Sequence, residues 1–311
     1  MADHSIVVVE VGPRDGLQFG STFFPTEAKI ELINRLSLTG LTRIEVTSFI
    51  HPKVIPNLRD ASDVVSGIKK VAGIIYSALV PNLKGCQRAL HTTIDELALF
   101  VSASEAHNQK NVGMSTEESL RGFSEIATLA KAAGKSVRGY IATAFGCPYE
   151  GLIPVERVKA IVNAYADMGV REVSLGDTTG MANPSQVTKT FRELMHANGK
   201  VSLAAHFHNS RGLGLANAIA AYQAGCRVFD SSLGGLGGCP TAEGAMGNIP
   251  TEDLVNMMEE MGINTGVNFA KLISSADLVK EVLKANLVSH TYNVGRPRWT
   301  PKIGNALSNR P

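Results

Sequence analysis

Short apolar segments alternate with longer amphipathic stretches along the whole chain. Continuous apolar runs of this length are typical of parallel strands that are buried on both faces. The predicted strands cover residues 6–10, 43–46, 74–79, 96–101, 137–142, 172–175, 202–206 and 227–231. Helical spacing of apolar positions predicts helices over residues 26–38, 116–133, 154–168, 184–196, 212–223, 250–261 and 268–285. Eight strands, each followed by a helix, predict a (β/α)8 TIM barrel with additional C-terminal helices.

A doubly wound open sheet is the alternative architecture for such a pattern. The first strand is not followed by a G-x-G-x-x-G sequence, which disfavours a dinucleotide-binding sheet. We therefore expect residues 1–311 to form a single TIM-barrel domain. Residues 268–311 are expected to form a helical extension and a loose tail, because the segment from Tyr292 onward is rich in Pro, Gly, Asn and Arg.

Composition and charge exclude several classes of function. The 30 Lys and Arg residues nearly balance the 28 Asp and Glu residues, and basic runs are missing, so a nucleic-acid partner is not expected. An uninterrupted apolar stretch of about 20 residues is also missing, so a membrane span is not expected. The N-terminus lacks the pattern of a signal peptide. The four cysteines form no C-x-x-C pair, which disfavours a thiolate zinc site. These features suggest a cytoplasmic protein with reduced thiols.

Polar residues gather at one end of the predicted strands. In a TIM barrel, catalytic groups come from the C-terminal ends of the strands and from the loops that follow them. These positions make Glu45, Asp177 and His206 candidate catalytic residues, and His206 is also one of the candidate metal ligands considered next. We expect the substrate to contact Arg14, Gln18, Ser48, Arg138 and Thr178.

His206 and His208 form the most specific pair in the sequence. Residues i and i+2 of a strand project from the same face, so one cation can bridge the two imidazoles. Asp15 adds an anionic oxygen and Asn248 a neutral one, and such a donor set suits Mg²⁺ or Mn²⁺, with Zn²⁺ as an alternative. The structural alternatives are hydrogen-bonded core histidines, a turn aspartate and a helix-capping asparagine.

Arg14 and Cys239 are the side chains that we expect to handle developing charge and protons. Arginine is always charged and presents several fixed donors, so Arg14 can stabilise an enolate oxygen. Its structural alternative is a surface ion pair. Cys239 lies in a glycine-rich segment, where a thiol can deliver a proton to a carbanion. Its structural alternative is a small apolar filler.

An ordered set of motifs resembles the hydroxymethylglutaryl-CoA lyase family. This family belongs to a barrel metallolyase superfamily that also contains isopropylmalate and homocitrate synthases. The motifs are V-G-P-R-D-G-L-Q (11–18), I-E-V-T-S-F (44–49), P-N-L-K-G (81–85), R-G-Y (138–140), G-C-P-Y-E-G (146–151), S-L-G-D-T (174–178), H-F-H-N (206–209), G-G-L-G-G-C-P (234–240) and G-N-I-P-T-E-D-L-V (247–255). R-D-G alone is a weak signal, but the ordered set is specific.

The resemblance implies a reaction and roles for individual residues. The family cleaves 3-hydroxy-3-methylglutaryl-CoA to acetyl-CoA and acetoacetate, and a related 3-hydroxy-3-alkylglutaryl-CoA would yield the matching 3-oxo acid. It implies an acyl-CoA thioester substrate, a divalent cation, no organic prosthetic group and a homodimer. The implied metal ligands are Asp15, His206, His208 and Asn248. Arg14 would stabilise the enolate, Cys239 would transfer a proton from a mobile loop, and Glu45 and Asp177 would also serve the site.

Departures from the family pattern bear on the acyl group. Phe19, Gly20 and Ser21 replace a segment that usually contains a lysine, and Asn209 and Arg211 replace an aspartate and an aromatic residue. The added positive charge suggests an altered acyl group.

Two alternative functions remain: a Claisen-type synthase of the same superfamily, and a non-catalytic acyl-CoA-binding protein. The glycine-rich loop and the short C-terminal region argue against the first, and the retained metal ligands against the second.

Overall fold

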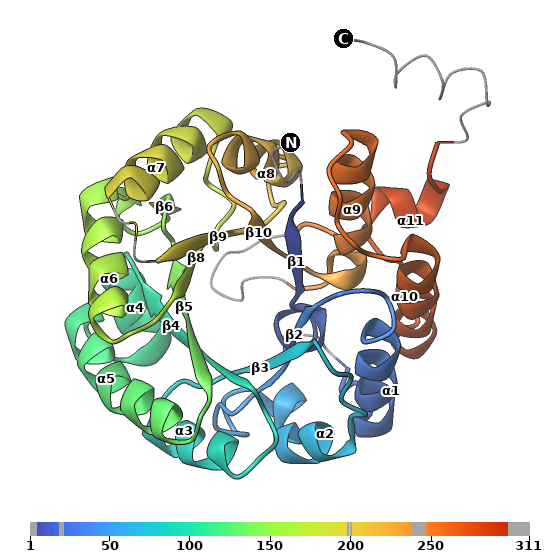
Figure 1. Ribbon diagram of the computed structural model, residues 1–311, viewed down its shortest axis with the longest axis horizontal. Coiled ribbons are helices and arrows are strands. Elements are labelled where there is room, and N and C mark those ends of the chain that lie inside the picture. Colours follow the sequence, from blue (N-terminus) through green and yellow to red (C-terminus); the bar gives the residue numbers. More distant parts are fainter. Residues whose placement is uncertain (1–4, 19–21, 198, 200, 238–246, 298–311) are drawn as a thin grey trace.

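In the computed structural model, parallel strands close into a barrel that is surrounded by helices (Figure 1). The structure describes residues 5–18, 22–197, 199, 201–237 and 247–297. The barrel strands are β1 (Val7–Glu10), β2 (Arg43–Ser48), β3 (Ile75–Leu79), β4 (Glu96–Ser102), β5 (Ser136–Ala142), β8 (Glu172–Asp177), β9 (Ser202–Phe207) and β10 (Val228–Ser231). They neighbour one another in the order β1-β10-β9-β8-β5-β4-β3-β2. The predicted TIM barrel is therefore confirmed, and each predicted strand overlaps an observed one.

Helices and helical turns connect consecutive strands on the outside of the barrel. The α-helices are α1 (Thr26–Leu36), α2 (Ala61–Gly67), α3 (Leu83–Leu90), α4 (Glu105–Val112), α5 (Thr116–Ala132), α6 (Val155–Asp167), α7 (Pro184–Ala197), α8 (Gly214–Gln223), α9 (Thr251–Glu260), α10 (Phe269–Leu283) and α11 (His290–Val294). The short turns are η1 (Gly12–Gly16), η2 (Pro56–Leu58) and η3 (Leu233–Gly235), and strands β6 (Gly146–Cys147) and β7 (Gly151–Leu152) form a small antiparallel hairpin.

The predictions missed the shortest elements. Helices α2, α3, α4 and α11 have eight residues or fewer, so each contains too few turns for a clear helical period. Helix α11 begins within the C-terminal segment, and the tail from residue 298 onward lies outside the described residues. Helix α10 packs beside α1 and α9 at the edge of the barrel (Figure 1). Among the described helices, none is long and apolar enough to cross a membrane.

Alternation along the strands separates two environments. On β4, Leu97, Leu99 and Val101 are fully buried in the large apolar cluster that also contains Ile126 of α5. Glu96, which precedes Leu97, pairs with Arg43, whose Nη2 donates to Glu96 Oε1 at 3.0 Å. Successive side chains of a strand point to opposite faces. The barrel wall is therefore apolar toward the helices, while charged groups and smaller apolar clusters share the interior.

The ion pairs of the barrel interior form a continuous series. Arg43 donates to Glu172 at 2.7 Å, and Arg138 donates from Nε to the same carboxylate at 2.7 Å. Arg138 also donates from Nη2 to Asp230 Oδ1 at 2.7 Å. Burying charges costs solvation free energy unless each charge has partners. Each of these arginines is paired with carboxylates, which meets this requirement. The series of ion pairs runs inside the barrel from the N-terminal ends of the strands toward their C-terminal ends.

Two buried glutamates organise the loops above β1 and β10. Glu10 accepts hydrogen bonds from the Gly12 and Leu233 N–H groups and from the Thr251 hydroxyl. Glu252 accepts from the Gly234 N–H at 2.9 Å. Burial raises the pKa of Glu10 to about 7 and that of Glu252 to about 8, against a lowering effect of these hydrogen bonds. Both groups therefore retain protons that the unfolded chain would release near its ordinary pKa of 4.5.

The raised pKa of Glu252 predicts a loss of stability with rising pH. Between its unfolded and folded pKa values, the folded protein binds more protons, so the free energy of unfolding falls as pH increases. Urea denaturation at about pH 5 and about pH 8 gives the free energy of unfolding at each pH. Between these pH values, that free energy should fall more in the wild type than in Glu252→Gln, by on the order of 2–4 kcal/mol. Equal changes in the two proteins would contradict this prediction.

Candidate active site

A cavity of about 440 Å³ opens at the C-terminal end of the barrel strands. Its polar lining residues are Arg14, Asp15, Gln18, His107, Asn111, Tyr140, Thr178, His206 and His208. The apolar residues Ile50, Val54, Ile55, Leu79 and Pro81, which follow or end β2 and β3, line it as well. The cavity therefore combines a set of charged and polar groups with an apolar surface that can contact a longer ligand.

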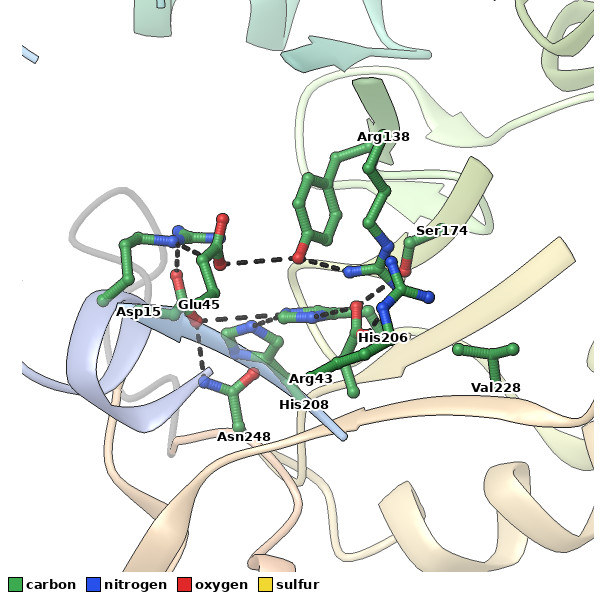
Figure 2. Close-up of polar contacts among 12 residues, drawn as sticks. Asp15, Arg43, Glu45, Arg138, Ser174, His206, His208, Val228 and Asn248 are labelled. Carbon is green, nitrogen blue, oxygen red and sulfur yellow. Dashed lines mark hydrogen bonds and ion pairs between the residues drawn. The ribbon is translucent and has the colours of Figure 1, made fainter. Parts of the chain in front are cut away.

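Three predicted metal ligands converge at the polar side of this cavity (Figure 2). His206 Nε2 lies 3.3 Å from His208 Nε2 and 3.9 Å from Asp15 Oδ2. One potential ligand atom from each of these residues lies within 4.8 Å of the others. Two imidazole nitrogens beside a carboxylate are a common donor set for a divalent cation. The residues present therefore fit a metal ion. In this structure a hydrogen bond connects the two histidines, and Asp15 lies at ion-pair distance from His206.

The fold explains why these groups meet. His206 lies on β9 and His208 follows its end, whereas Asp15 lies in η1, which follows β1. Strand β10 separates β9 from β1 in the barrel. Parallel strands present their C-terminal ends at the same rim, so the loops of nearby strands share one site.

Asn248 contacts Asp15 instead of capping a helix. Its Nδ2 donates to Asp15 Oδ2 at 2.7 Å and to the Leu236 carbonyl at 3.1 Å. Pro250 is the N-cap residue of α9, so the capping alternative for Asn248 is not observed. The side-chain carbonyl of Asn248 is the neutral oxygen that it can offer to a cation. A Cβ atom at Gly237 would lie only 2.7 Å from Asn248 Nδ2, so glycine permits this close approach.

Arg14 is held between two carboxylates. Its Nε donates to Glu45 Oε2 at 2.7 Å, and its Nη1 donates to Asp15 Oδ1 at 2.6 Å. Gln18 Nε2 also donates to Asp15 Oδ1 at 2.6 Å. The guanidinium is buried and lies 5.7 Å from the ring centre of Tyr140. The alternative of a surface ion pair is therefore wrong for Arg14, because its partners are buried in the cavity wall.

The charges of the site keep Asp15 ionised. Burial alone would raise the pKa of the Asp15 carboxyl, but Arg14 and the two histidines lower it below its usual value. Glu45 differs, because burial outweighs the effect of Arg14 and raises its pKa. A carboxylate that remains charged beside two imidazoles is suited to bind a cation.

The other predicted site residues occupy different positions. Thr178 lines the cavity, and its hydroxyl accepts from the Thr143 N–H. Ser48 is buried, and its hydroxyl accepts from the Ile50 N–H. Arg138 lies inside the barrel, where it contacts Glu172, the Tyr140 hydroxyl and Asp230. Thr178 thus lines the cavity, whereas Ser48 and Arg138 are buried and are not among the residues that line it. Cys239 lies outside the described residues.

Asp177 is buried at the end of β8, between the cavity-lining residues Gly176 and Thr178. Its Oδ1 accepts from the Met181 and Ala182 N–H groups at 2.8 and 3.1 Å. Its Oδ2 has no hydrogen-bond partner among the described residues. Burial raises the pKa of Asp177 to about 6, against the lowering effect of these backbone hydrogen bonds. A carboxyl group with this pKa can exchange a proton near neutral pH.

Sequence reasoning missed five polar residues of the site. Ser174 donates to Asp230, which contacts His206, whereas Tyr140, His107 and Asn111 line the cavity. Tyr140 belongs to the R-G-Y motif, and Asp230 is the only acidic residue in the predicted strand 227–231, so both carried a signal. His107 Nδ1 is buried without a hydrogen-bond partner in the described part of the chain. Nothing in the sequence near His107 indicated that α4 reaches the cavity.

Two of the departures from the family pattern can be located. Asn209 accepts from the Gly214 N–H at 3.0 Å, near the start of α8. Arg211 donates from Nη1 to the Thr179 and Gly180 carbonyls at 2.8 and 2.9 Å, so its side chain contacts the loop after β8. Residues 19–21 lie outside the described residues.

The chain is similar to known proteins over most of its length. The HMGL-like family model matches residues 5–279. The chain is 48% identical over 289 residues to the hydroxymethylglutaryl-CoA lyase YngG of Bacillus subtilis. The aligned region covers 93% of this chain and 97% of that protein. It is 45% identical over 278 residues to the mitochondrial hydroxymethylglutaryl-CoA lyase of Rattus norvegicus. This aligned region covers 89% of this chain and 86% of that protein.

A solved structure extends the likeness to three dimensions. It is an HMG-CoA lyase from Acinetobacter baumannii in complex with coenzyme A and 3-methylmalate. The TM-score is 0.91 at 45% identity, over 97% of this chain and 99% of that chain. The resemblance inferred from the ordered motifs is confirmed. This chain therefore belongs to the HMGL-like family and, within it, to the hydroxymethylglutaryl-CoA lyases.

Proposed function

We propose that this chain cleaves 3-hydroxy-3-methylglutaryl-CoA into acetyl-CoA and acetoacetate by retro-Claisen chemistry. The observation that carries the proposal is the convergence of His206, His208 and Asp15 beside Arg14, at the end of a TIM-barrel cavity. The identity with proteins named hydroxymethylglutaryl-CoA lyase supports it, as does the similar structure in complex with coenzyme A.

The reaction makes three demands on the protein. The tertiary hydroxyl on C3 must lose its proton and become the ketone of acetoacetate. The C2–C3 bond then breaks, and its electron pair forms the enolate of the acetyl-CoA thioester. Finally, C2 must receive a proton. A catalyst therefore needs a base, a group that stabilises the enolate oxygen and an acid.

We assign the cation to Asp15, His206, His208 and Asn248, as Mg²⁺ or Mn²⁺. Two imidazoles with oxygen donors, and no thiolate among the described residues of the cluster, suit these ions. When bound, a divalent cation supplies Lewis acidity, which makes a nearby hydroxyl easier to deprotonate. The carboxylates around the cluster add negative charge that favours its binding. No organic prosthetic group is needed for this chemistry.

Arg14 provides positive charge where the enolate forms. Glu45 and Asp15 hold its guanidinium from two sides, so its position is set before the substrate enters. Preorganised charge in a water-poor site stabilises a developing anion strongly. Asp177 is suited to the role of the base, because its pKa of about 6 leaves it ionised at neutral pH.

The cavity suits the remainder of an acyl-CoA thioester. Gln18 and Thr178 offer polar contacts near the reacting groups, and the apolar surface that includes Ile50 and Val54 can contact the arm of the thioester. Ser48 and Arg138 affect the substrate through their neighbours; Arg138, for example, donates to the Tyr140 hydroxyl. A homodimer stays a prediction, which measurement of the molar mass in solution would test.

The direct test is to incubate purified protein with Mg²⁺ or Mn²⁺ and a panel of 3-hydroxy-3-alkylglutaryl-CoA esters. We expect the 3-methyl ester to yield acetyl-CoA and acetoacetate, and EDTA to abolish the reaction. A larger alkyl group that reacts faster would redefine the acyl specificity. Failure to cleave any ester, together with release of free CoA from acetyl-CoA and a 2-oxo acid, would favour a synthase and contradict the proposal.

We propose that Cys239 protonates the carbanion, as the family resemblance implies. Replacing Cys239 by alanine should then lower kcat far more than it lowers the amount of bound metal, because the thiol transfers a proton without being a ligand. Steady-state kinetics and metal analysis of the same preparation measure both quantities. Loss of the metal from the Cys239→Ala protein would contradict this role.

A further inference from the structure

Asp230 contacts His206 on the side of the ring that faces away from His208. Its Oδ2 lies 3.2 Å from His206 Nδ1. On the other side of the ring, His206 Nε2 lies 3.3 Å from His208 Nε2 (Figure 2). Asp230 is on β10, next to β9, and the two residues are paired in the parallel ladder. The imidazole therefore lies between a carboxylate at one nitrogen and the candidate metal ligands at the other.

Both oxygens of Asp230 are already engaged by donors. Arg138 Nη2 donates to Oδ1 at 2.7 Å, and the Ser174 hydroxyl donates to Oδ2 at 2.8 Å. The Asp230 side chain is completely buried, and Arg138 is 1% exposed. These contacts stabilise the ionised carboxylate, which is then only a hydrogen-bond acceptor.

An acceptor at this position determines which nitrogen of His206 carries the proton. A neutral imidazole has one N–H and one lone pair. Because an ionised Asp230 can only accept, the N–H belongs on Nδ1, and the lone pair is left on Nε2. That lone pair is directed toward the site shared with His208 and Asp15.

We propose that Asp230 is a positioning residue that fixes the Nδ1–H tautomer and the ring orientation of His206, so that Nε2 is presented to the cation. This inference rests on the metal site assigned under the proposed function. Metal-binding histidines often donate their second ring N–H to a carboxylate, which also increases the basicity of the ligand nitrogen. Arg138 contributes indirectly, because Glu172 and Asp230 both bind it inside the barrel.

The experiment combines NMR with a metal titration. Histidine-selective ¹⁵N labelling of the metal-free wild type reports the tautomer directly, and the His206→Gln spectrum assigns the signals. We expect the Nδ1–H form in the wild type and a shift toward the Nε2–H form in Asp230→Asn, because the new amide can donate to Nδ1. Electron paramagnetic resonance titration should show Mn²⁺ binding weakened by about 10- to 100-fold.

Asp253→Asn is the matched control. Asp253 is another buried aspartate, whose carboxylate accepts from the Ser289 hydroxyl and from the His290 and Thr291 N–H groups. Its substitution also removes a buried charge, but it should leave the His206 tautomer and the Mn²⁺ affinity unchanged. An equal loss of affinity in the control would indicate a merely structural role for Asp230 and overturn the inference.

The tautomer of the wild type decides the question even if Asp230→Asn fails to fold. A predominant Nε2–H form would overturn the inference, and so would an Asp230→Asn protein with wild-type Mn²⁺ affinity. Wild-type protein that binds no Mn²⁺ would instead refute the metal site of the proposed function. The spectrum of the metal-free protein would still report whether Asp230 fixes the ring.

Discussion

Substitution of Arg14 by glutamine will lower kcat by about 100- to 1,000-fold, while KM changes much less. Arg14 is a buried cation in direct contact with the ligand cluster through Asp15, and its guanidinium is held by Glu45 and Asp15 at 2.7 and 2.6 Å. A charge that acts on the enolate stabilises the transition state more than the bound substrate. Its loss therefore reduces turnover and leaves most of the ground-state binding. Steady-state kinetics at saturating metal concentration will measure the effects on kcat and on KM separately.

Two further variants separate catalysis from stability. Arg14→Lys retains the positive charge but loses the planar fork, so an intermediate kcat is expected. Arg296→Gln removes a more exposed arginine from its ion pair with Glu259 near the C-terminus, and kcat should not change. A tenfold or larger rise in KM with an unchanged kcat in Arg14→Gln would assign Arg14 to substrate binding and reject its role at the enolate.

Replacement of His208 by alanine is expected to weaken Mn²⁺ binding by at least about 100-fold, because even the outer partners of metal ligands affect affinity by about 10- to 100-fold. His208 Nε2 lies 3.3 Å from His206 Nε2, and its removal leaves one imidazole beside Asp15. Activity at low metal concentration should disappear with the affinity, and excess Mn²⁺ should restore only part of it. Calorimetric titration of the metal-free protein gives the dissociation constants.

The matched control for His208 is His107→Ala. His107 is also a buried histidine that lines the same cavity, but it lies on α4 and outside the Asp15–His206–His208 cluster. Its loss should leave Mn²⁺ affinity unchanged. Retention of wild-type affinity in His208→Ala would show that the cluster is a hydrogen-bonded group of core residues and would remove the basis of the proposed mechanism.

The strands were predictable because a parallel barrel buries both faces of its wall. In β4, residues 97–101 read Leu-Ala-Leu-Phe-Val, a continuous apolar run that is visible without any knowledge of the neighbouring strands. Short helices such as α4 were not predictable, because their few turns contain little periodicity and tertiary packing stabilises them. The missed helix α4 is also the one that carries His107 to the cavity.

The candidate metal ligands were as predictable as the strands. His206 ends a predicted strand and His208 follows two residues later, while Asp15 follows another strand, so these side chains were expected to meet at the rim of the barrel. The role of Arg138 was less accessible. Its side chain lies in the interior and contacts Glu172 and Asp230, which are distant in sequence. Which residue an arginine pairs with depends on barrel closure, and local pattern contains no information about that.

Sequence pattern alone was sufficient for the eight-stranded barrel, for the family and for naming the candidate metal ligands, because periodicity, ordered motifs and side-chain chemistry can be read directly from the chain. The surroundings of those residues came only from the tertiary structure. The carboxylate of Asp230 behind His206, the two carboxylates that hold Arg14 and the buried Oδ2 of Asp177 all depend on contacts between strands or loops that are far apart in the chain. Ring closure brings these groups together, and their mutual distances determine which ion pairs and hydrogen bonds they form.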